Sequence, residues 1–458
     1  MRSYGFTRKA LVPLASAIAL ASATGGGAWA APKETVLYAF KGGNDGVGPY
    51  GGGPTIGGNG NIYGTTQLGG GTGCGGGGCG VVFRVAPDGT ETVLHEFVGG
   101  DHDGGNPSST LIIDKDGNLF GVAQVGGGTG CGGSGCGVVF KLEPPSGSAT
   151  KWTFSLLHSF TGGSDGGDPS EGALVADKEG NLYGATTFGG AIKAKVCAPQ
   201  SQFDFAGCGV VFKVARDGAY SVLYTFEQTR DGNGPNANLV FDAKGNLYGT
   251  TAQGGLDTHC PAGGFYPGCG VVFELTPPSG SATSWTEKVL YTFTGLTDGA
   301  APLAGPLIDA QGNLYGTTDA GGNDQDCVNG ALTAGCGTVW KLSPGGLLTT
   351  LHTFTGGSDG GFPGSSLIAD CKGNLYGTAA DGGAHGLGVV FKILPNGAFS
   401  VLYSFKGGKD GANPLEDPLT ADSAGNIYGV TQFGGPTNNG TVFKLTDTGF
   451  VTGSACSS

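Results

Sequence analysis

The stretch ALVADKEGNLYGATT (173–187), followed after a loop by GVVFKVARDGAYSVLYTF (209–226), decides the fold. It contains four short apolar runs that are rich in β-branched and aromatic residues, and none has the 3.6-residue period of an amphipathic helix. The turns KEGN and RDG supply glycines that accept positive φ and close tight hairpins. The run GVVF lacks alternation, which is typical of a strand covered on both faces. The stretch therefore predicts four antiparallel strands.

The same unit recurs seven times along the chain. The motif Gly-Asn-(Leu/Ile)-(Tyr/Phe)-Gly repeats at intervals of 52 to 67 residues. It is followed by Gly-(Val/Thr)-Val-(Phe/Trp), by Leu-(Tyr/His)-x-Phe and by Asp-Gly-x-x-Pro, whose aspartates are Asp45, Asp103, Asp165, Asp231, Asp298, Asp359 and Asp410. Seven units of four strands predict an all-β fold, a seven-bladed β-propeller of four-stranded antiparallel blades. The alternative is a parallel β-helix, whose coils are shorter and need no tight hairpins.

The two ends of the chain each hold part of one blade. ETVLYAF (34–40) is a fourth-strand motif that precedes any complete unit, whereas the seventh unit has GTVFKL (440–445) without a fourth strand. We expect the N-terminal strand to close the ring in the seventh blade, because closure removes exposed sheet edges. The expected organisation is a signal peptide at 1–30 and a single domain at 31–458. That domain has a closing strand at 34–40, repeats over about 52–445 and a short tail at 446–458.

Residues 1–30 have the features of an export signal. MRSYGFTRK is basic, ALVPLASAIALASA is a short apolar run, and Ala28-Trp29-Ala30 has the small-x-small pattern of a cleavage site. Cleavage near Ala30 predicts a secreted or periplasmic protein. It removes three positive charges and takes the formal net charge from −13 to −16. This acidity excludes nucleic acid as a partner, and no later run suits membrane insertion. We expect a monomer.

The glycine-rich loops between the second and third strands carry paired cysteines. An exported protein favours disulfides, and closing so short a loop gives about 2 kcal/mol in the chain-entropy model. Zinc is the alternative, but it needs four converging ligands and these pairs lie on different blades, so no metal site is expected. The expected disulfides are Cys74–Cys79, Cys131–Cys136, Cys197–Cys208, Cys260–Cys269 and Cys327–Cys336.

Cys371 and Cys456 remain, and we expect a bond between them as well. Cys371 lies in a tight turn of the sixth unit. If the N-terminal strand closes the ring, the C-terminal tail leaves the seventh blade on the same face as that turn.

Antiparallel alternation places the Asp-Gly-x-x-Pro connections and the cysteine-bearing loops on one face of the disc, the loop face. The tight turns lie on the other, the turn face. Repetition of the Asp-Gly aspartate favours a structural role, although a carboxylate ring also suits a polyhydroxylated ligand. No cofactor is expected, with calcium as the alternative. The ligand-binding candidates are residues that differ between blades on the loop face: Asp101, His102, Asp103, Asp165, Asp168, Glu171, Arg230, His259, Phe265 and Tyr266.

The motifs GNLYGTT, GCGVVFKL and VLYSF, together with DGANP, closely resemble the bacterial GloVer, or choice-of-anchor, tandem-repeat family. The resemblance covers nearly all of residues 34–445. It implies a secreted repeat protein, often tethered at the cell surface by a C-terminal anchor. The tail TDTGFVTGSACSS (446–458) has neither a hydrophobic segment nor a sorting signal, so free secretion is expected. The family supplies no catalytic residues to carry over.

Two functions fit these observations. The first is a secreted binding or scaffold module for an extracellular glycan or protein, because aromatics beside carboxylates on rigidly held loops suit sugars. The alternative is a hydrolase or lyase acting on an extracellular polysaccharide. It would use a carboxylate pair among Asp101, Asp103, Asp165, Asp168 and Glu171. The chain contains no Gly-x-Ser-x-Gly nucleophile elbow leading from a strand into a helix, no phosphate loop and no His-Glu-x-x-His, so catalytic residues stay unassigned and binding is favoured.

Overall fold

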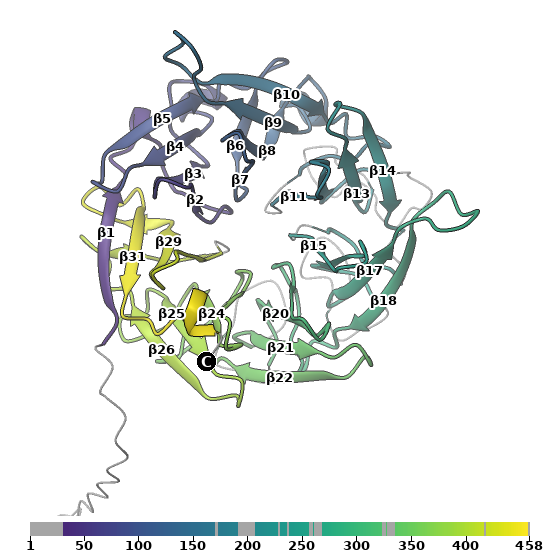
Figure 1. Cartoon of the computed structure of the whole chain (residues 1–458), viewed down its shortest axis with the longest axis vertical. Coiled ribbons are helices and arrows are strands. Elements are labelled where there is room, and N and C mark those ends of the chain that lie inside the picture. Colours follow the sequence, from purple (N-terminus) through teal and green to yellow (C-terminus); the bar gives the residue numbers. More distant parts are fainter. Residues whose placement is uncertain are drawn as a thin grey trace, which may run out of the picture. The chain divides into compact units, whose positions relative to one another are not determined.

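The computed structural model describes residues 31–169, 173–190, 207–227, 230–235, 238–255, 260, 268–322, 327, 335–415 and 418–456. Their strands form seven four-stranded antiparallel blades around a ring, as the repeats predict (Figure 1). Within each blade the innermost strand is short, and the next two strands are long and buried. In blades 1–6 the order of the strands follows the chain, whereas the outer strand of blade 7 comes from the N-terminus.

The strands of the first four blades follow the chain in order. Blade 1 contains β2 (Thr55–Ile56), β3 (Ile62–Thr66), β4 (Val81–Val85) and β5 (Glu91–Glu96). Blade 2 contains β7 (Ile112–Ile113), β8 (Leu119–Gly126), β9 (Val138–Glu143) and β10 (Thr153–Ser159), with β6 (Gly104–Pro107) paired to β8. Blade 3 contains β11 (Val175–Ala176), β12 (Leu182–Thr186), β13 (Val210–Val214) and β14 (Tyr220–Thr225). Blade 4 contains β15 (Val240–Phe241), β16 (Leu247–Thr251), β17 (Val271–Thr276) and β18 (Thr286–Thr292).

The last three blades keep the same order until the ring closes. Blade 5 contains β19 (Leu307–Ile308), β20 (Leu314–Thr318), β21 (Thr338–Leu342) and β22 (Leu348–Thr353). Blade 6 contains β23 (Ile368–Ala369), β24 (Leu375–Ala379), β25 (Val389–Ile393) and β26 (Phe399–Ser404). Blade 7 contains β28 (Thr420–Ala421), β29 (Ile427–Thr431), β31 (Thr441–Thr446) and β1 (Lys33–Ala39), beside a small sheet of β27 (Gly411–Ala412) and β30 (Phe433–Gly434). The 3-10 turns are η1 (Gly43–Asp45), η2 (Cys74–Gly76), η3 (Cys131–Gly133) and η5 (Gly453–Cys456).

The N-terminal strand closes the ring, as the orphan motif predicts. β1 pairs antiparallel with β31, from Lys33 opposite Thr446 to Ala39 opposite Thr441 (Figure 1). Phe40 follows β1, is fully buried and meets the ring of Phe83 edge-to-face at 5.0 Å between centroids. Blade 7 is therefore built from both ends of the chain, and it has no open outer edge at β31.

The third strand of each blade is buried on both faces, which explains its unbroken apolar sequence. In β4, Val81 and Phe83 pack in the cluster shared with blade 7, whereas Val82 packs in the cluster shared with blade 2. The glycine of the second strand makes room for the aromatic residue. A Cβ on Gly64 would lie 2.6 Å from Cζ of Phe83. The Gly-Asn-(Leu/Ile)-(Tyr/Phe)-Gly motif and the Gly-(Val/Thr)-Val-(Phe/Trp) motif therefore recur together. The last glycine of the first motif leaves the space that the aromatic ring of the second motif fills.

Five described disulfides match the predicted pairs. Four staple loops on the loop face: Cys74–Cys79, Cys131–Cys136, Cys260–Cys269 and Cys327–Cys336. Cys208 is also disulfide-bonded, and its expected partner Cys197 lies outside the described residues. Disulfides of this number indicate an oxidising compartment, extracellular or periplasmic. In the part of the chain that the structure describes, no helix has the length and apolar character of a membrane span.

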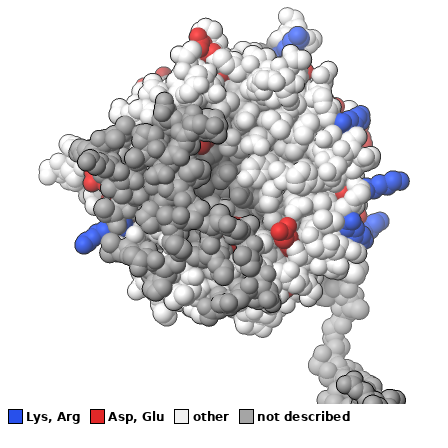
Figure 2. All heavy atoms as spheres, turned by 180° about the vertical axis from the view of Figure 1, so that it is seen from behind, with Lys and Arg blue, Asp and Glu red and all other residues white. Residues whose placement is uncertain are grey.

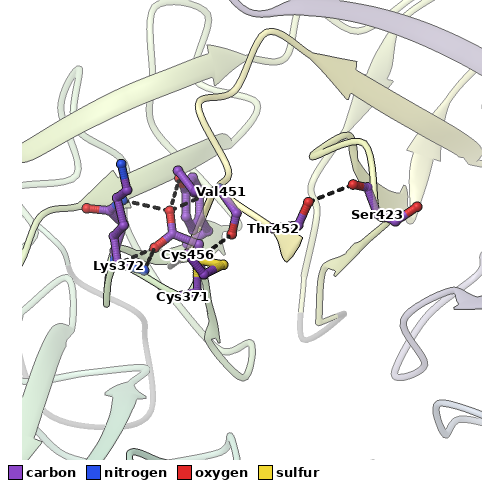
Figure 3. Close-up of a disulfide and its surroundings, with 9 residues drawn as sticks. Cys371, Lys372, Ser423, Val451, Thr452 and Cys456 are labelled. Atoms are coloured by element: carbon purple, nitrogen blue, oxygen red, sulfur yellow. Dashed lines mark hydrogen bonds between the residues drawn. A yellow bond between two sulfur atoms is a disulfide. The ribbon is translucent and has the colours of Figure 1, made fainter. Parts of the chain in front are cut away.

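The fifth disulfide joins Cys371 and Cys456, 85 residues apart (Figure 3). It ties the C-terminal tail to the turn between β23 and β24. Around it, the backbone N–H of Val451 donates to Oδ2 of Asp370 at 3.3 Å, and Oγ1 of Thr452 donates to the carbonyl of Ser423 at 2.6 Å (Figure 3). The tail thus crosses from blade 7 to blade 6 on the turn face.

Candidate functional site

The aspartate of Asp-Gly-x-x-Pro holds a side chain of the preceding fourth strand in every blade. A tyrosine hydroxyl donates to it at 2.7–3.0 Å in four blades, and a histidine Nε2 lies 3.0–3.3 Å from it in the other three. Each carboxylate also accepts a backbone N–H of its own connection. The pairs are Tyr38–Asp45, His95–Asp103, His158–Asp165, Tyr224–Asp231, Tyr291–Asp298, His352–Asp359 and Tyr403–Asp410. Two binding candidates, Asp103 and Asp165, therefore organise turns.

The next blade supplies a matched neighbour for each of these rings. Every histidine stacks on an aromatic ring, with centroid distances of 4.2 Å for His95–Phe154, 3.7 Å for His158–Tyr220 and 3.8 Å for His352–Phe399. Burial lowers the pKa of His158 and His352, which keeps these stacked rings neutral at neutral pH. Three tyrosines instead have a glutamate of the next blade near enough to help raise the pKa of the tyrosine, after burial and the turn aspartate, in the pairs Tyr38–Glu91, Tyr224–Glu287 and Tyr403–Glu34. Tyr291 packs with Leu348.

The glutamates in these pairs predict a pH-dependent stability. Burial, followed by the nearby Asp45, raises the pKa of Glu91 to about 7. Because this pKa exceeds the ordinary value of 4.5, the folded chain keeps the proton of Glu91 at pH values where the unfolded chain has lost it. The contribution of this proton to the stability of the fold is fully present below pH 4.5 and is lost as pH rises through 7. Glu91→Gln should leave stability at pH 5 nearly unchanged and raise it at pH 8.5 by about 1 kcal/mol, a figure reduced for the half-exposed carboxyl. Urea unfolding at both pH values measures this difference.

Glu96→Gln on the same strand is the matched control, because Glu96 is exposed. An equal gain at pH 8.5 from both variants would mean that net charge, rather than the Glu91–Asp45 contact, sets the effect. Burial also raises the pKa of Glu34 and of Glu287 to about 7. The same substitution at those two positions should repeat the result.

A pocket of about 560 Å³ lies on the loop face between the cysteine-bearing loops of blades 1 and 2. The disulfides of these loops stand at its wall, and Val98 and Val125 give it apolar surface. Gly75 and Gly133 also line it, with φ of 77° and 94°, in the left-handed region that favours glycine. Because these glycines carry no side chain, the loop backbone borders the pocket directly. Four side chains contribute polar groups: Asn106, Gln124, Ser134 and Asp168.

The structure separates the predicted site residues into four groups. Only Asp168 lines this pocket. Asp103 and Asp165 hold turns, as described above. Asp101 and His102 are exposed in the connection between blades 1 and 2, and Arg230 is exposed in the connection between blades 3 and 4. The last four lie outside the described residues: Glu171, His259, Phe265 and Tyr266.

Asn106 and Gln124 line the pocket but were not predicted. Asn106 and Asp168 both stand immediately before the proline of Asp-Gly-x-x-Pro, where φ is between 52° and 63° in all seven copies. Glycine, asparagine or aspartate fills that position in five copies, and these are the residue types that most readily adopt a positive φ. This signal could have identified Asn106. Gln124 lies within the second strand of blade 2, β8, and carries no comparable signal.

Among the described residues, charged side chains are few on the side of the ring that Figure 2 shows. In the view of Figure 2, Lys and Arg side chains lie at the periphery, and most of the described surface nearer the centre is uncharged. Within the described ranges, no group of three or more His, Cys, Asp or Glu side chains is arranged to hold a metal ion. The distribution favours a ligand without strong charge, bound through hydrogen bonds to amide, carboxylate and backbone groups.

A family model described as the Gloeobacter/Verrucomicrobia repeat matches residues 24–255, 134–332 and 259–455. No curated protein matches the chain. Among solved structures, a luciferin-regenerating enzyme is similar with a TM-score of 0.41 and 12% identity, over 92% of this chain and 97% of that one. A gluconolactonase from Xanthomonas campestris has a TM-score of 0.39 and 11% identity, over 90% of this chain and 89% of that one. At these values the likeness concerns the fold alone.

Proposed function

Because this chain belongs to the Gloeobacter/Verrucomicrobia repeat family, which makes it an array of like blades, we propose that its function lies where the blades differ on the loop face. The protein is a binding module, and residues 1–30 direct its export and are then cleaved. It holds an uncharged extracellular glycan in the pocket between blades 1 and 2 as a monomer. A rigid ring with stapled loops suits this task, since binding residues collect on loops positioned by a scaffold.

The pocket itself is the observation that carries this proposal. Its volume of about 560 Å³ falls in the usual range for small-ligand sites, about 300–1,000 Å³. Disulfides on both sides hold the two glycine loops, so little loop ordering remains to oppose binding. This matters because glycine loses more conformational freedom on ordering than any other residue.

The polar groups of the pocket match the chemistry of sugar hydroxyls. The amides of Asn106 and Gln124 provide N–H donors, and the carboxylate of Asp168 provides an acceptor. A hydroxyl can donate and accept at once, so this mixture can engage vicinal hydroxyls. Val98 and Val125 provide apolar surface for the C–H face of a sugar ring. The side chains around this pocket therefore supply both kinds of contact that a pyranose needs.

The proposal is tested with purified residues 31–458 and a panel of neutral and acidic extracellular polysaccharides. Retention and the release of reducing ends or unsaturated products are followed in the same samples. Retention of a neutral polysaccharide without product release supports the binding module. Product release would instead establish the enzyme alternative, and failure to retain any neutral polysaccharide would overturn the proposal.

Substitutions at the left-handed position then locate the site. Asn106→Gly and Asp168→Gly introduce the residue that the repeat itself uses at Gly48 and Gly234, so the backbone stays compatible. The double variant should weaken retention about tenfold or more, the effect of losing one or two hydrogen bonds. Asn413→Gly is the matched control, because Asn413 occupies the same position in blade 6 and bonds Asp381. Equal losses from the double variant and the control would place the site elsewhere.

A further inference from the structure

A second kind of site lies on the turn face, in the slots between neighbouring blades. Each slot is bordered by the aromatic residue of the Gly-Asn-(Leu/Ile)-(Tyr/Phe)-Gly motif, by the fourth strand of the same blade and by the first strand of the next. Between blades 1 and 2 these are Tyr63, Leu94 and Ile113, and Trp152 fills the slot among them. Trp285 likewise packs on Tyr183 between blades 3 and 4. Aromatic rings of the chain itself thus fill such slots.

The slot between blades 6 and 7 has a different internal occupant. Phe450 of the C-terminal tail packs on Tyr376, with 4.9 Å between ring centroids. Leu402 and Ala421 complete the same cluster. A hairpin fills two slots and a tail fills a third, so the slot accepts an aromatic side chain from differently shaped polypeptide segments.

Between blades 4 and 5 the equivalent slot is open. Tyr248, Leu290 and Ile308, the counterparts of Tyr63, Leu94 and Ile113, line a cavity of about 820 Å³. The reason is in the next blade. Blade 5 turns from β21 to β22 through the short segment 343–347, which contains Gly345 and Gly346, whereas blades 2 and 4 have a longer hairpin that ends in tryptophan. No ring of blade 5 therefore reaches into the slot.

The charge beside this slot is also reversed. In the third strand, six blades carry arginine or lysine at the position that lies opposite the motif aromatic. Five of these lysines place Nζ over the aromatic ring, 5.1–5.9 Å from its centroid: Lys141, Lys213, Lys341, Lys392 and Lys444. Blade 4 has Glu274 instead, whose Oε1 accepts the hydroxyl of Tyr248 at 3.0 Å. Among the described residues, no cation lies over the ring of Tyr248.

Of the carboxylates at the cavity, only that of Glu274 is not part of a turn, and it accepts the Tyr248 hydroxyl and lies opposite Lys288 across β17 and β18. Asp242 and Asp309 line the cavity, but their oxygens accept side-chain and backbone N–H groups of their own turns. Lys244 and Lys288 also border it. The three carboxylates outnumber the two ammonium groups, so the cavity keeps a negative balance.

We propose that this slot binds a partner polypeptide that presents an aromatic side chain next to a lysine or arginine. The aromatic ring takes the place that Trp152, Trp285 and Phe450 take in the filled slots. The cation lies between the face of Tyr248 and the carboxylate of Glu274, where the other blades place their own lysine. The site is on the face opposite to the glycan pocket, so the two proposals stand or fall separately.

Dipeptides test the proposal directly on purified residues 31–458. Ac-Trp-Lys-NH2 and Ac-Trp-Glu-NH2 are titrated and followed by NMR line broadening of the ligand. We expect the lysine peptide to bind about fivefold more tightly than the glutamate peptide, the effect of one partly exposed charge pair. Equal affinity for the two peptides, or no binding of either, would overturn the proposal.

Three variants assign the effect to the slot. Glu274→Gln should abolish the preference for lysine while keeping the tryptophan contact. Glu274→Lys restores the residue of the other blades and should weaken the lysine peptide further. Glu287→Gln is the matched control, because Glu287 precedes Lys288 in β18 and points to the opposite face of the blade. Loss of preference in the control as well would show that the peptide binds elsewhere and would overturn the proposal.

Discussion

A chain that begins at residue 41 is expected not to form the seven-bladed ring. It lacks β1, so β31 loses the pairing that runs from Thr446 to Thr441 and becomes an open edge. It also lacks Phe40, which is fully buried against Phe83 between blades 7 and 1. Loss of a buried phenylalanine alone costs about 3–5 kcal/mol, a large share of the 5–15 kcal/mol that stabilises a typical protein.

We expect this truncated chain to aggregate, or to lose its cooperative thermal transition, because an unpaired strand edge invites association. Circular dichroism melting and size-exclusion chromatography measure both outcomes. A chain that begins at residue 33 is the control, since it keeps all of β1 and should melt like residues 31–458. A synthetic peptide of residues 31–50 added during refolding should restore part of the soluble protein. A soluble 41–458 chain with an unchanged transition would contradict the role given to β1.

The second large effect is expected from removing the Cys371–Cys456 disulfide. This bond closes a loop of 85 residues, whereas Cys74–Cys79 closes one of 5. In the chain-entropy model such loops contribute about 4.5 and about 2 kcal/mol, respectively. Cys371→Ser with Cys456→Ser should therefore lower the free energy of unfolding about twice as much as Cys74→Ser with Cys79→Ser. Guanidinium unfolding of the two double variants under oxidising conditions makes the comparison.

Reduction provides an independent check. Cys371 and Cys456 are both exposed, whereas each of the four fully described loop disulfides has one cysteine that is at most 1% exposed, even where its partner is exposed, as at Cys74. Low concentrations of dithiothreitol should therefore cleave the tail disulfide first and bring the wild-type chain to the stability of its double variant. Equal losses in the two double variants would mean that native contacts of the tail, and not the constraint on the unfolded chain, determine its contribution.

Much of the fold could be predicted because each blade repeats the same local rules. Strand order, ring closure and the pairing of Cys371 with Cys456 follow from hairpin alternation and from counting incomplete motifs. The burial of Val81, Val82 and Phe83 follows from their unbroken apolar run. These features depend on contacts within one repeat or on the number of repeats, and both are visible in a single chain.

The candidate sites were harder to predict because they depend on contacts between blades. Asp103 resembled a ligand-binding residue, yet its carboxylate is occupied by His95 and a backbone N–H. Glu274 breaks a pattern of arginine and lysine that is visible in the sequence. This change can be interpreted only once it is known that those arginines and lysines lie beside the aromatic residue of the second strand. Neither the twist of the blades nor the path of a hairpin into the neighbouring slot can be obtained from spacing alone.

The matched neighbours on the outer strands have a consequence for how so repetitive a chain assembles. A histidine meets an aromatic ring on the next blade, while three tyrosines meet a glutamate and one meets a leucine. The seams are thus of three kinds, so a blade that presents a histidine fits a neighbour with an aromatic ring better than one with a glutamate. Blades 3 and 6 have the same kinds of seam residue, so the seams restrict which blades can be neighbours without fixing a unique order. This restriction limits misassembly between chains and the recombination of repeats within one.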